Sequence, residues 1–245
     1  MSARRTRATA LRVLRQLRHD PRTVVLLLAV PCVLQILIHA LFDSRPAVFQ
    51  SLGVPLLGLF PFVAMFIVTS ITMLRERVSG TLERLMTTPL GRGDLLVGYA
   101  LAFALVAAAQ ATLVSLLSFG LLGLDSGHRA VFVVALAIAN AILGMSLGLF
   151  ASAFARTEFQ AVQFMPAFVL PQILLCGLIV PRDEMAEWLR VISAVMPLTY
   201  AYDALAQLAS SAALSARFWA DVAVVAGVTV LALGLGAATL RRRTP

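Results

Sequence analysis

Long apolar segments, separated by short polar ones, make up most of this chain. Six of them approach the ~20 residues that a helix needs to cross a bilayer core, and they cover 21–41, 53–74, 95–122, 130–154, 159–180 and 219–240. Asp20 and Pro21 are residue types preferred at the cap and in the first turn of a helix, so they mark the start of the first span. The pattern predicts an all-α polytopic membrane protein with six transmembrane helices, a transmembrane domain over 21–240 and a short basic tail over 241–245.

The N-terminal residues 1–20 are basic and amphipathic. As a helix, they place Ala10, Val13, Leu14 and Leu17 on one side and several arginines on another. This arrangement is typical of an interfacial helix that lies on a surface of anionic lipid. A secretory signal peptide is the competing interpretation. No clear small-residue cleavage site precedes the end of the following apolar run, which favours an uncleaved first span.

A charged segment lies between the second and third predicted spans. As a helix over 75–88, it collects its apolar residues on one face, while the opposite face carries Glu76, Gly80 and Glu83. Pro89 and the glycines after it end this helix. One interpretation is a solvated loop between spans. The other is a docking helix at the membrane surface, which offers two carboxylates and a glycine to a soluble partner.

Residues 181–218 are too numerous and too apolar for a simple loop between the last two spans. They predict two short amphipathic helices, the first near Met185 and Trp188, and the second containing Tyr200 after Pro197. Tryptophan and tyrosine are the residue types expected at the level of the lipid head groups. We interpret this segment as a re-entrant or surface-lying hairpin on the outer side, which shapes the mouth of a pathway. A purely structural plug is the alternative.

The interiors of the spans carry packing signals and few charges. Gly144 and Gly148 form a small-xxx-small pattern in the fourth span, which allows a neighbouring helix to approach closely. The amides Gln35 and Gln110 favour hydrogen bonds between helices over contacts with a cargo. Carboxylates are missing from the middles of the spans. Proton- or ion-coupled transport is therefore less well supported than transport driven from outside the bilayer.

Composition supports a membrane protein and excludes autonomous ATP hydrolysis. The chain is 60% hydrophobic and 13% charged, and its mean hydropathy is +0.91, as in polytopic membrane proteins. All 20 basic residues are arginine, so the phosphate-binding lysine of a Walker A loop is missing. The net charge of +8 does not indicate nucleic-acid binding, because the arginines lie beside apolar spans and follow the positive-inside pattern.

The distribution of the arginines predicts the orientation. Fifteen of them fall on the side that holds both termini and the segment 75–88, and five fall on the opposite side. Because arginine resists translocation, both termini and this segment are expected in the cytoplasm.

The sequence resembles a known family, the type-2 permeases of ABC transporters. This family includes drug exporters of the daunorubicin-resistance kind and polysaccharide exporters. The resemblance to the cytoplasmic loop of these permeases is carried by Arg75-Glu76-Arg77, Gly80-Thr81-Leu82-Glu83-Arg84-Leu85, Thr88-Pro89-Leu90 and Gly93-Asp94-Leu95-Leu96. The resemblance to their fifth span and outer hairpin is carried by Gln160-Ala161, Pro171, Gly177, Pro181, Met185, Trp188-Leu189 and Pro197-Leu198-Thr199-Tyr200. The likeness extends over nearly the whole chain from Pro21 onward.

The resemblance implies a permease subunit of an ATP-driven exporter in the plasma (inner) membrane, with a lipophilic or amphiphilic drug or lipid as cargo. It implies a second permease, identical or related, and two copies of a separate ATP-binding subunit that hold the ATP and magnesium. This chain would then carry no cofactor of its own and would not be an enzyme. The segment 75–88 would be the coupling helix, with Glu76, Arg77, Gly80, Thr81, Glu83 and Arg84 docked on the ATPase.

Two other functions stay open. A polysaccharide or glycolipid exporter of the same family would need a channel lined by aromatic and polar groups, whereas these spans are rich in leucine, alanine and valine. A membrane-embedded enzyme would need paired carboxylates, histidines or metal ligands near the end of a span. His19, His39 and His128 instead lie on opposite predicted sides of the membrane and have no partner at ligand spacing.

Overall fold

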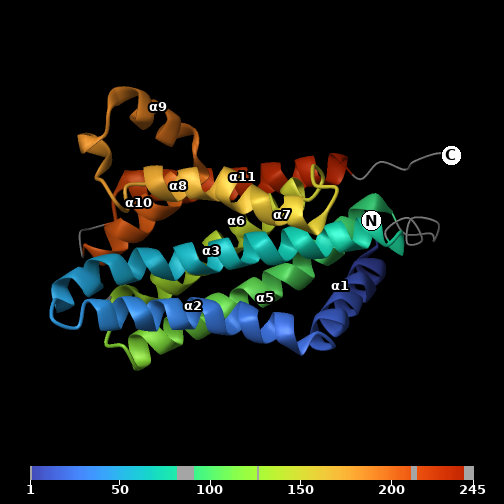
Figure 1. Cartoon of the computed structure of the whole chain (residues 1–245), viewed down its shortest axis with the longest axis horizontal. Coiled ribbons are helices and arrows are strands. Elements are labelled where there is room, and N and C mark those ends of the chain that lie inside the picture. Colours follow the sequence, from blue (N-terminus) through green and yellow to red (C-terminus); the bar gives the residue numbers. More distant parts are fainter. Residues whose placement is uncertain (1, 82–90, 126, 211–213, 240–245) are drawn as a thin grey trace.

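The long helices of this protein lie side by side in an elongated bundle (Figure 1). The computed structural model describes residues 2–81, 91–125, 127–210 and 214–239, and every element in these ranges is helical. The start of α1 (Ala3–Arg18) and the end of α11 (Ala216–Ala238) lie at the same end of the bundle, which we call the terminal end. The opposite end, toward α9 (Glu187–Val195), we call the hairpin end.

Five of the described helices are long and apolar enough to cross a membrane. They are α2 (Pro21–Leu41), α3 (Pro46–Val78), α5 (Arg92–Gly120), α6 (Ala130–Ala151) and α11. Each contains or overlaps one of the predicted spans, and α3 is the most extended of them. The prediction of an all-helical membrane protein is confirmed.

The predicted fifth span is helical without a gap over 158–175, but a π-helical turn divides it into three elements. These are α7 (Glu158–Phe164), a π-helical turn over Met165–Val169 and α8 (Leu170–Leu175). Pro166 has no N–H to donate and lies in the π-helical turn, where the regular i to i−4 hydrogen bonds are replaced. The segment ends before Gly177, whose φ of +103° lies in the region that favours glycine. The described residues therefore hold five long apolar helices that could span a membrane, and a sixth crossing would require this irregular helical segment.

Helix α1 packs against protein where the sequence pattern suggests a lipid surface. Its predicted apolar side includes Ala10, Val13 and Leu17, and all three are buried, with α1 packed mainly against α5. The approach is close, because a Cβ at Gly98 of α5 would overlap the side chain of Thr9. The amphipathic helix is thus present, but its apolar stripe covers α5. Its exposed side carries Arg4, Arg5, Arg7, Arg15 and Arg18.

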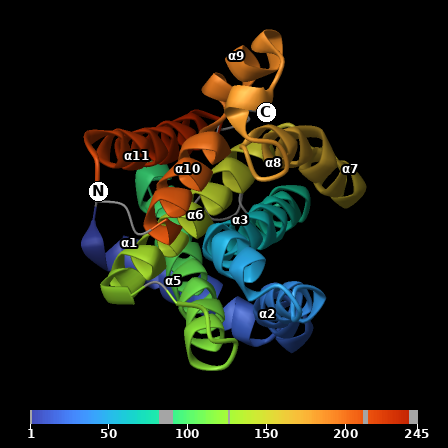
Figure 2. The same cartoon turned by 90° about the vertical axis from the view of Figure 1, so that its left-hand side faces the viewer.

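Helix α6 lies in the middle of the bundle, in contact with α3, α5, α10 (Pro197–Ala209) and α11 (Figure 2). Its most extensive packing is against α3. A Cβ added at Gly144 would overlap the Phe62 carbonyl, and one added at Gly148 would overlap the Phe66 carbonyl. The two glycines therefore lie where the backbones of α3 and α6 approach each other most closely.

Two glutamines within the spans bind neighbouring helices. Gln35 of α2 donates from Nε2 to the Gly53 carbonyl of α3 at 3.1 Å. Gln110 of α5 donates to the Leu27 carbonyl of α2 at 2.6 Å. These bonds confirm the expectation that the amides connect helices, and they hold α2, the least buried of the five long helices, to the bundle.

Two helices, α9 and α10, occupy the segment predicted as a hairpin. They differ in environment, since α9 stands away from the bundle while α10 packs against α3, α6 and α11 (Figures 1 and 2). Trp188 of α9 is exposed, whereas Leu198, Leu205 and Leu208 of α10 are buried. The first helix is therefore exposed, as a surface-lying segment would be, whereas the apolar side of α10 belongs to the core, as in the re-entrant alternative. Met185 lies just before α9, after the 3₁₀ turn Arg182–Glu184.

Candidate functional site

The terminal end of α3 is more deeply embedded in the bundle than the sequence pattern suggests. Helix α3 runs without interruption beyond the predicted span to Val78, so its last turn keeps the register of the preceding ones. Residues that recur at helical spacing on one side of α3 are all buried, and they are Phe62, Phe66, Thr69, Met73 and Glu76. Glu76 thus continues a core-facing stripe and does not begin a new helix.

Glu76 forms the centre of a buried polar cluster. Its side chain is 3% exposed, and its Oε2 lies 3.5 Å from Nη2 of Arg12 on α1. The same Arg12 nitrogen donates to the hydroxyl of Tyr99 on α5, and the guanidinium carbon lies 5.6 Å from the Tyr99 ring centre. This position differs from the predicted one, in which Glu76 presents its carboxylate at the surface beside Glu83.

The residues on either side of Glu76 connect α3 to two further helices. Arg75 donates from Nε and Nη2 to the two carboxylate oxygens of Glu158 on α7, at 2.8 and 2.9 Å. These hydrogen bonds keep the pKa of Glu158 below its usual value. Arg77 donates to the hydroxyl of Thr239 at 3.3 Å. Thr239 caps the C-terminus of α11, where a cation is favoured by the helix dipole.

Three consecutive residues therefore bind α3 to most of the bundle. Successive side chains on a helix point about 100° apart, so Arg75, Glu76 and Arg77 spread over more than half of its circumference. They reach α7, α1 and α11 respectively, and Tyr99 adds α5 through Arg12. A displacement of this end of α3 would act on four neighbouring helices.

The segment after α3 begins with a turn at Gly80. Ser79 is the C-cap residue, and Gly80 has φ +69°, the left-handed conformation common just after a helix. The predicted helix over 75–88 is therefore interrupted: residues 75–78 belong to α3, and the chain changes direction at Gly80. The Thr81 hydroxyl lies 2.9 Å from that of Ser79. Glu83 and Arg84 lie outside the described residues.

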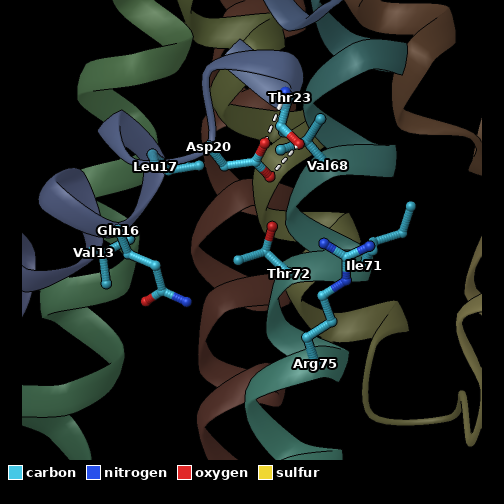
Figure 3. Close-up of a pocket in the computed structure, with 9 residues that line it drawn as sticks. All are labelled: Val13, Gln16, Leu17, Asp20, Thr23, Val68, Ile71, Thr72 and Arg75. Carbon is cyan, nitrogen blue, oxygen red and sulfur yellow. Dashed lines mark hydrogen bonds between the residues drawn. The ribbon is translucent and has the colours of Figure 1, made fainter.

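A cavity of about 160 Å³ lies beside this cluster, between α3 and the elbow that joins α1 to α2 (Figure 3). Asp20 occupies the elbow and accepts hydrogen bonds from the Thr23 amide and hydroxyl at 3.2 and 2.6 Å, which confirms its predicted role as a helix cap. These two bonds, chiefly that from the hydroxyl, lower the pKa of Asp20. Arg75 reaches the cavity from α3.

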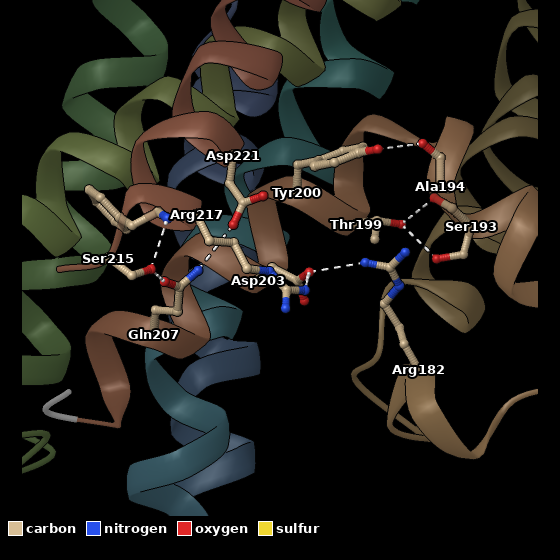
Figure 4. Close-up of polar contacts among 11 residues, drawn as sticks. Arg182, Ser193, Ala194, Thr199, Tyr200, Asp203, Gln207, Ser215, Arg217 and Asp221 are labelled. Atoms are coloured by element: carbon tan, nitrogen blue, oxygen red, sulfur yellow. Dashed lines mark hydrogen bonds and ion pairs between the residues drawn. The ribbon is translucent and has the colours of Figure 1, made fainter. Parts of the chain in front are cut away.

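A second polar cluster lies at the hairpin end (Figure 4). Asp203 of α10 accepts from Arg182 at 3.1 Å and from Arg217 of α11 at 2.9 Å. Gln207 donates to Asp221 of α11 at 3.0 Å. These contacts bind α10 to α11 and to the turn that precedes α9. Of the residues predicted for the hairpin, Tyr200 donates to the Ala194 carbonyl at 2.6 Å. Trp188 is exposed on α9, and Pro197 is the first residue of α10.

Sequence patterns missed Arg12, Tyr99 and Asp203, although each is central to one of the two clusters. The Arg12 and Glu76 positions are separated by 64 residues, so no local periodicity relates them. One signal was available for Glu76, because the apolar stripe of the second span reaches it at a spacing of three and four residues. The prediction of a separate helix over 75–88 did not include this continuation of the α3 stripe to Glu76.

A bundle of apolar helices of membrane-spanning length, with its charged contacts gathered at the two ends, defines a multi-pass helical membrane protein. The chain belongs to the ABC-2 type transporter family, whose sequence model matches residues 4–209. This match confirms the family expected from the loop and hairpin residues.

The chain is similar to several curated permeases. It is 31% identical over 156 residues to the probable multidrug ABC transporter permease YbhR of Escherichia coli K12, which covers 62% of this chain and 42% of that protein. It is 27% identical over 180 residues to the probable multidrug permease YbhS of the same organism, covering 72% and 47%. The linearmycin resistance permease protein LnrN of Bacillus subtilis is 25% identical over 142 residues, covering 58% and 37%. The chain therefore spans less than half of the length of these relatives.

Proposed function

We propose that this chain is the permease subunit of an ATP-driven exporter that moves lipophilic or amphiphilic compounds out of the cytoplasm or the inner leaflet. The observation that carries this proposal is the cluster at the end of α3, where Arg75, Glu76 and Arg77 connect one helix end to four other helices. Such a cluster suits a protein that receives a mechanical input at one point and rearranges its spans. The multidrug and antibiotic-resistance names of the relatives support the choice of cargo.

The input would come from separate ATP-binding subunits, two copies for a pair of permeases. Residues 81–90 follow the cluster directly, and we assign the contact with the ATPase to this segment, including Thr81, Glu83 and Arg84. ATP-driven closure of the two ATPases would press on the segment and displace the end of α3. Because ATP binds the closed state more tightly, it would shift the population between two arrangements of the spans by no more than that difference in affinity.

The orientation we propose places the terminal end in the cytoplasm and the hairpin end outside the plasma (inner) membrane. The irregular helical segment α7 to α8 would provide the sixth crossing, so that both termini share one side. The support for this orientation is the excess of arginines on the predicted cytoplasmic side. Helices α9 and α10 would then shape the outer mouth of the pathway.

Cysteine labelling tests this orientation. Ser79 and Ser215 are both exposed and lie at opposite ends of the bundle. In intact cells, a membrane-impermeant thiol reagent is expected to label Ser215→Cys and to leave Ser79→Cys unlabelled until the membrane is permeabilised. The parent chain, with Cys32 half-buried and Cys176 buried, sets the background. Labelling of Ser79→Cys alone in intact cells would reverse the assigned orientation.

Purification from the native membrane tests the function. When the chain is extracted in mild detergent, we expect a protein with its own Walker A loop to accompany it, and we expect the ATPase activity of this complex to respond to amphiphilic compounds. The matched control is the same preparation with the catalytic ATPase disabled, which should retain the complex and lose the activity. A chain that arrives alone and transports without ATP would contradict the proposal.

A further inference from the structure

The cavity at the elbow between α1 and α2 is lined by charged, neutral polar and apolar groups. Asp20 lies beside Thr23 and level with Val68 of α3 (Figure 3). Arg75 reaches the cavity from further along α3, while Val13 and Leu17 of α1 add apolar surface. Along α3, Arg75 and Val68 are two turns apart, about 10 Å at 1.5 Å per residue. The cavity therefore presents an acidic and a basic group at different positions along α3, with apolar side chains of α1 and α3 around them.

The two charges of this cavity are opposite and remain apart. Asp20 and Arg75 attract each other across the cavity, yet they form no ion pair. The Asp20 carboxylate is held by Thr23, and the Arg75 guanidinium uses Nε and Nη2 for Glu158. Nη1 of Arg75 makes no hydrogen bond within the described part of the chain. Each charged group is thus fixed in place by a neighbour and retains capacity for one further partner.

The size of the cavity and its neutral polar groups also suit a head group. A volume of about 160 Å³ is roughly ten times what one ordered water needs, so the cavity accommodates a small molecular group. Gln16 and Thr72 face the cavity, and neither side chain makes a hydrogen bond to any residue that the structure describes. They are available to a ligand that carries both donors and acceptors.

We propose that this elbow pocket binds the head group of a zwitterionic amphiphile from the inner leaflet, of the phosphoethanolamine type, with its ammonium at Asp20 and its phosphate at Arg75. A purely anionic head group would be repelled by the Asp20 carboxylate. A purely cationic head group would be repelled by Arg75 and the nearby Arg22. A zwitterion pairs with both Asp20 and Arg75. This inference rests on the proposed orientation, which puts Asp20 and Arg75 at the inner membrane surface.

Lipid titration followed by native mass spectrometry tests the site. The detergent-purified complex is titrated with phosphatidylethanolamine, phosphatidylcholine or phosphatidylglycerol. Phosphatidylethanolamine is expected to bind most tightly, because its ammonium donates hydrogen bonds that a choline group cannot donate. Asp20→Asn is expected to weaken this binding about tenfold, the loss typical of one charge-assisted hydrogen bond. Asparagine caps helices as well as aspartate does, so the elbow should keep its fold.

Two matched controls separate the pocket from the general lipid surface. Asp43→Asn removes an exposed carboxylate at the other end of α2 and should leave the titration unchanged. Thr72→Trp fills the pocket and should abolish tight binding, whereas Leu231→Trp, at an exposed position of α11, should not. Equal binding of phosphatidylethanolamine by the parent and the Asp20→Asn variant would overturn the proposal. Equal affinity for phosphatidylglycerol would do the same.

The outcome also distinguishes this inference from the proposed function. If Asp20→Asn binds the lipid normally while the complex keeps compound-stimulated ATPase activity, only the elbow pocket is rejected. If the lipid binds as expected but no ATPase accompanies the chain, only the exporter is rejected. Adding ATP to the complex in phosphatidylcholine vesicles then identifies the source of the head group. A bound lipid released with each turnover is cargo, and one that stays bound is a resident lipid, and both results support the site.

Discussion

Gly144→Ala is expected to destabilise the bundle although it adds only one carbon atom. That Cβ would overlap the backbone of Phe62 on α3, and a backbone carbonyl cannot rotate away as a side chain can. Relief requires α3 and α6 to separate along their most extensive contact. Overpacking of this kind typically costs about 1–3 kcal/mol, and we expect the upper part of that range because the obstacle is a main chain. Denaturation in mixed micelles, with SDS as the titrant, measures the change in the free energy of unfolding.

Gly234→Ala supplies the matched control for this experiment. Gly234 lies in the long helix α11, and a Cβ added there has no neighbour within 4 Å. Without a steric penalty, alanine should stabilise the helix by up to about 1 kcal/mol through its higher helix propensity. The same substitution in two long helices is therefore expected to have opposite signs. Equal effects at both positions would contradict the close approach of α3 and α6.

The periodicity of the sequence was sufficient to predict the long helices, but it did not predict which helices pack against each other. The lengths of the apolar runs predicted the five uninterrupted spans, because a bilayer fixes the number of residues that a helix needs. The apolar stripe of residues 1–20 was also predicted, yet it covers α5 and not lipid. An apolar stripe must be buried, but its period does not state what buries it.

The sequence pattern also failed to predict two local features, the π-helical turn in the fifth span and the buried position of Glu76. The sequence pattern treated residues 159–180 as one span, whereas the structure has a π-helical turn at Met165–Val169, because the local helix geometry around a proline depends on the neighbouring helices. Glu76 was assigned to a separate loop helix because charge marks the end of a span. In the structure α3 continues through Val78, and it is Gly80, two residues further, that ends the regular backbone.

The candidate site was predictable as a location but not as a set of contacts. The charged segment after the second span was identified from its position, and Glu76, Arg77 and Gly80 lie there as named. Their partners come from distant segments, since Arg12, Thr239 and Glu158 belong to α1, the end of α11 and α7. Pairings of this separation are set by tertiary packing, which spacing within one helix does not encode.

Glu76→Leu is expected to have the largest functional effect, because it removes the buried carboxylate that joins α3 to α1. It leaves the Arg12 guanidinium, whose side chain is about one-third exposed, without its acid. Breaking a fully buried pair costs about 3–5 kcal/mol. The partial exposure of Arg12 reduces this, so we expect a loss of about 1–3 kcal/mol, the cost of an unsatisfied polar group. The same SDS titration measures it.

Adding Arg12→Leu to Glu76→Leu separates the effect of this pair on the stability of the bundle from its effect on the transmission of motion from the ATPase to α1. The comparison is made in a Tyr99→Phe background, which removes the buried hydroxyl that Arg12 would leave unpaired. Replacing both members of a buried pair with apolar residues is often neutral, so in this background the double variant should regain most of the lost stability. If the pair transmits motion from the ATPase to α1, the double variant should still lack ATPase stimulation by amphiphiles in the purified complex. A stable double variant with normal stimulation would show that the pair is only structural.

Glu158→Leu is the comparison for Glu76→Leu, because Glu158 of α7 pairs with Arg75, the residue next to Glu76 on α3. It breaks the pair with Arg75, in which both side chains are more than half exposed, so the cost should be no more than about 1 kcal/mol. The two carboxylates contact adjacent residues of α3 but differ in burial. Because stiff, water-excluded contacts transmit a displacement better than solvated ones, Glu158→Leu should retain most of the stimulated ATPase activity. Equal losses from the two substitutions would mean that the contact with α7 matters as much as the buried one with α1, and that the displacement of α3 is shared between both sides of the bundle.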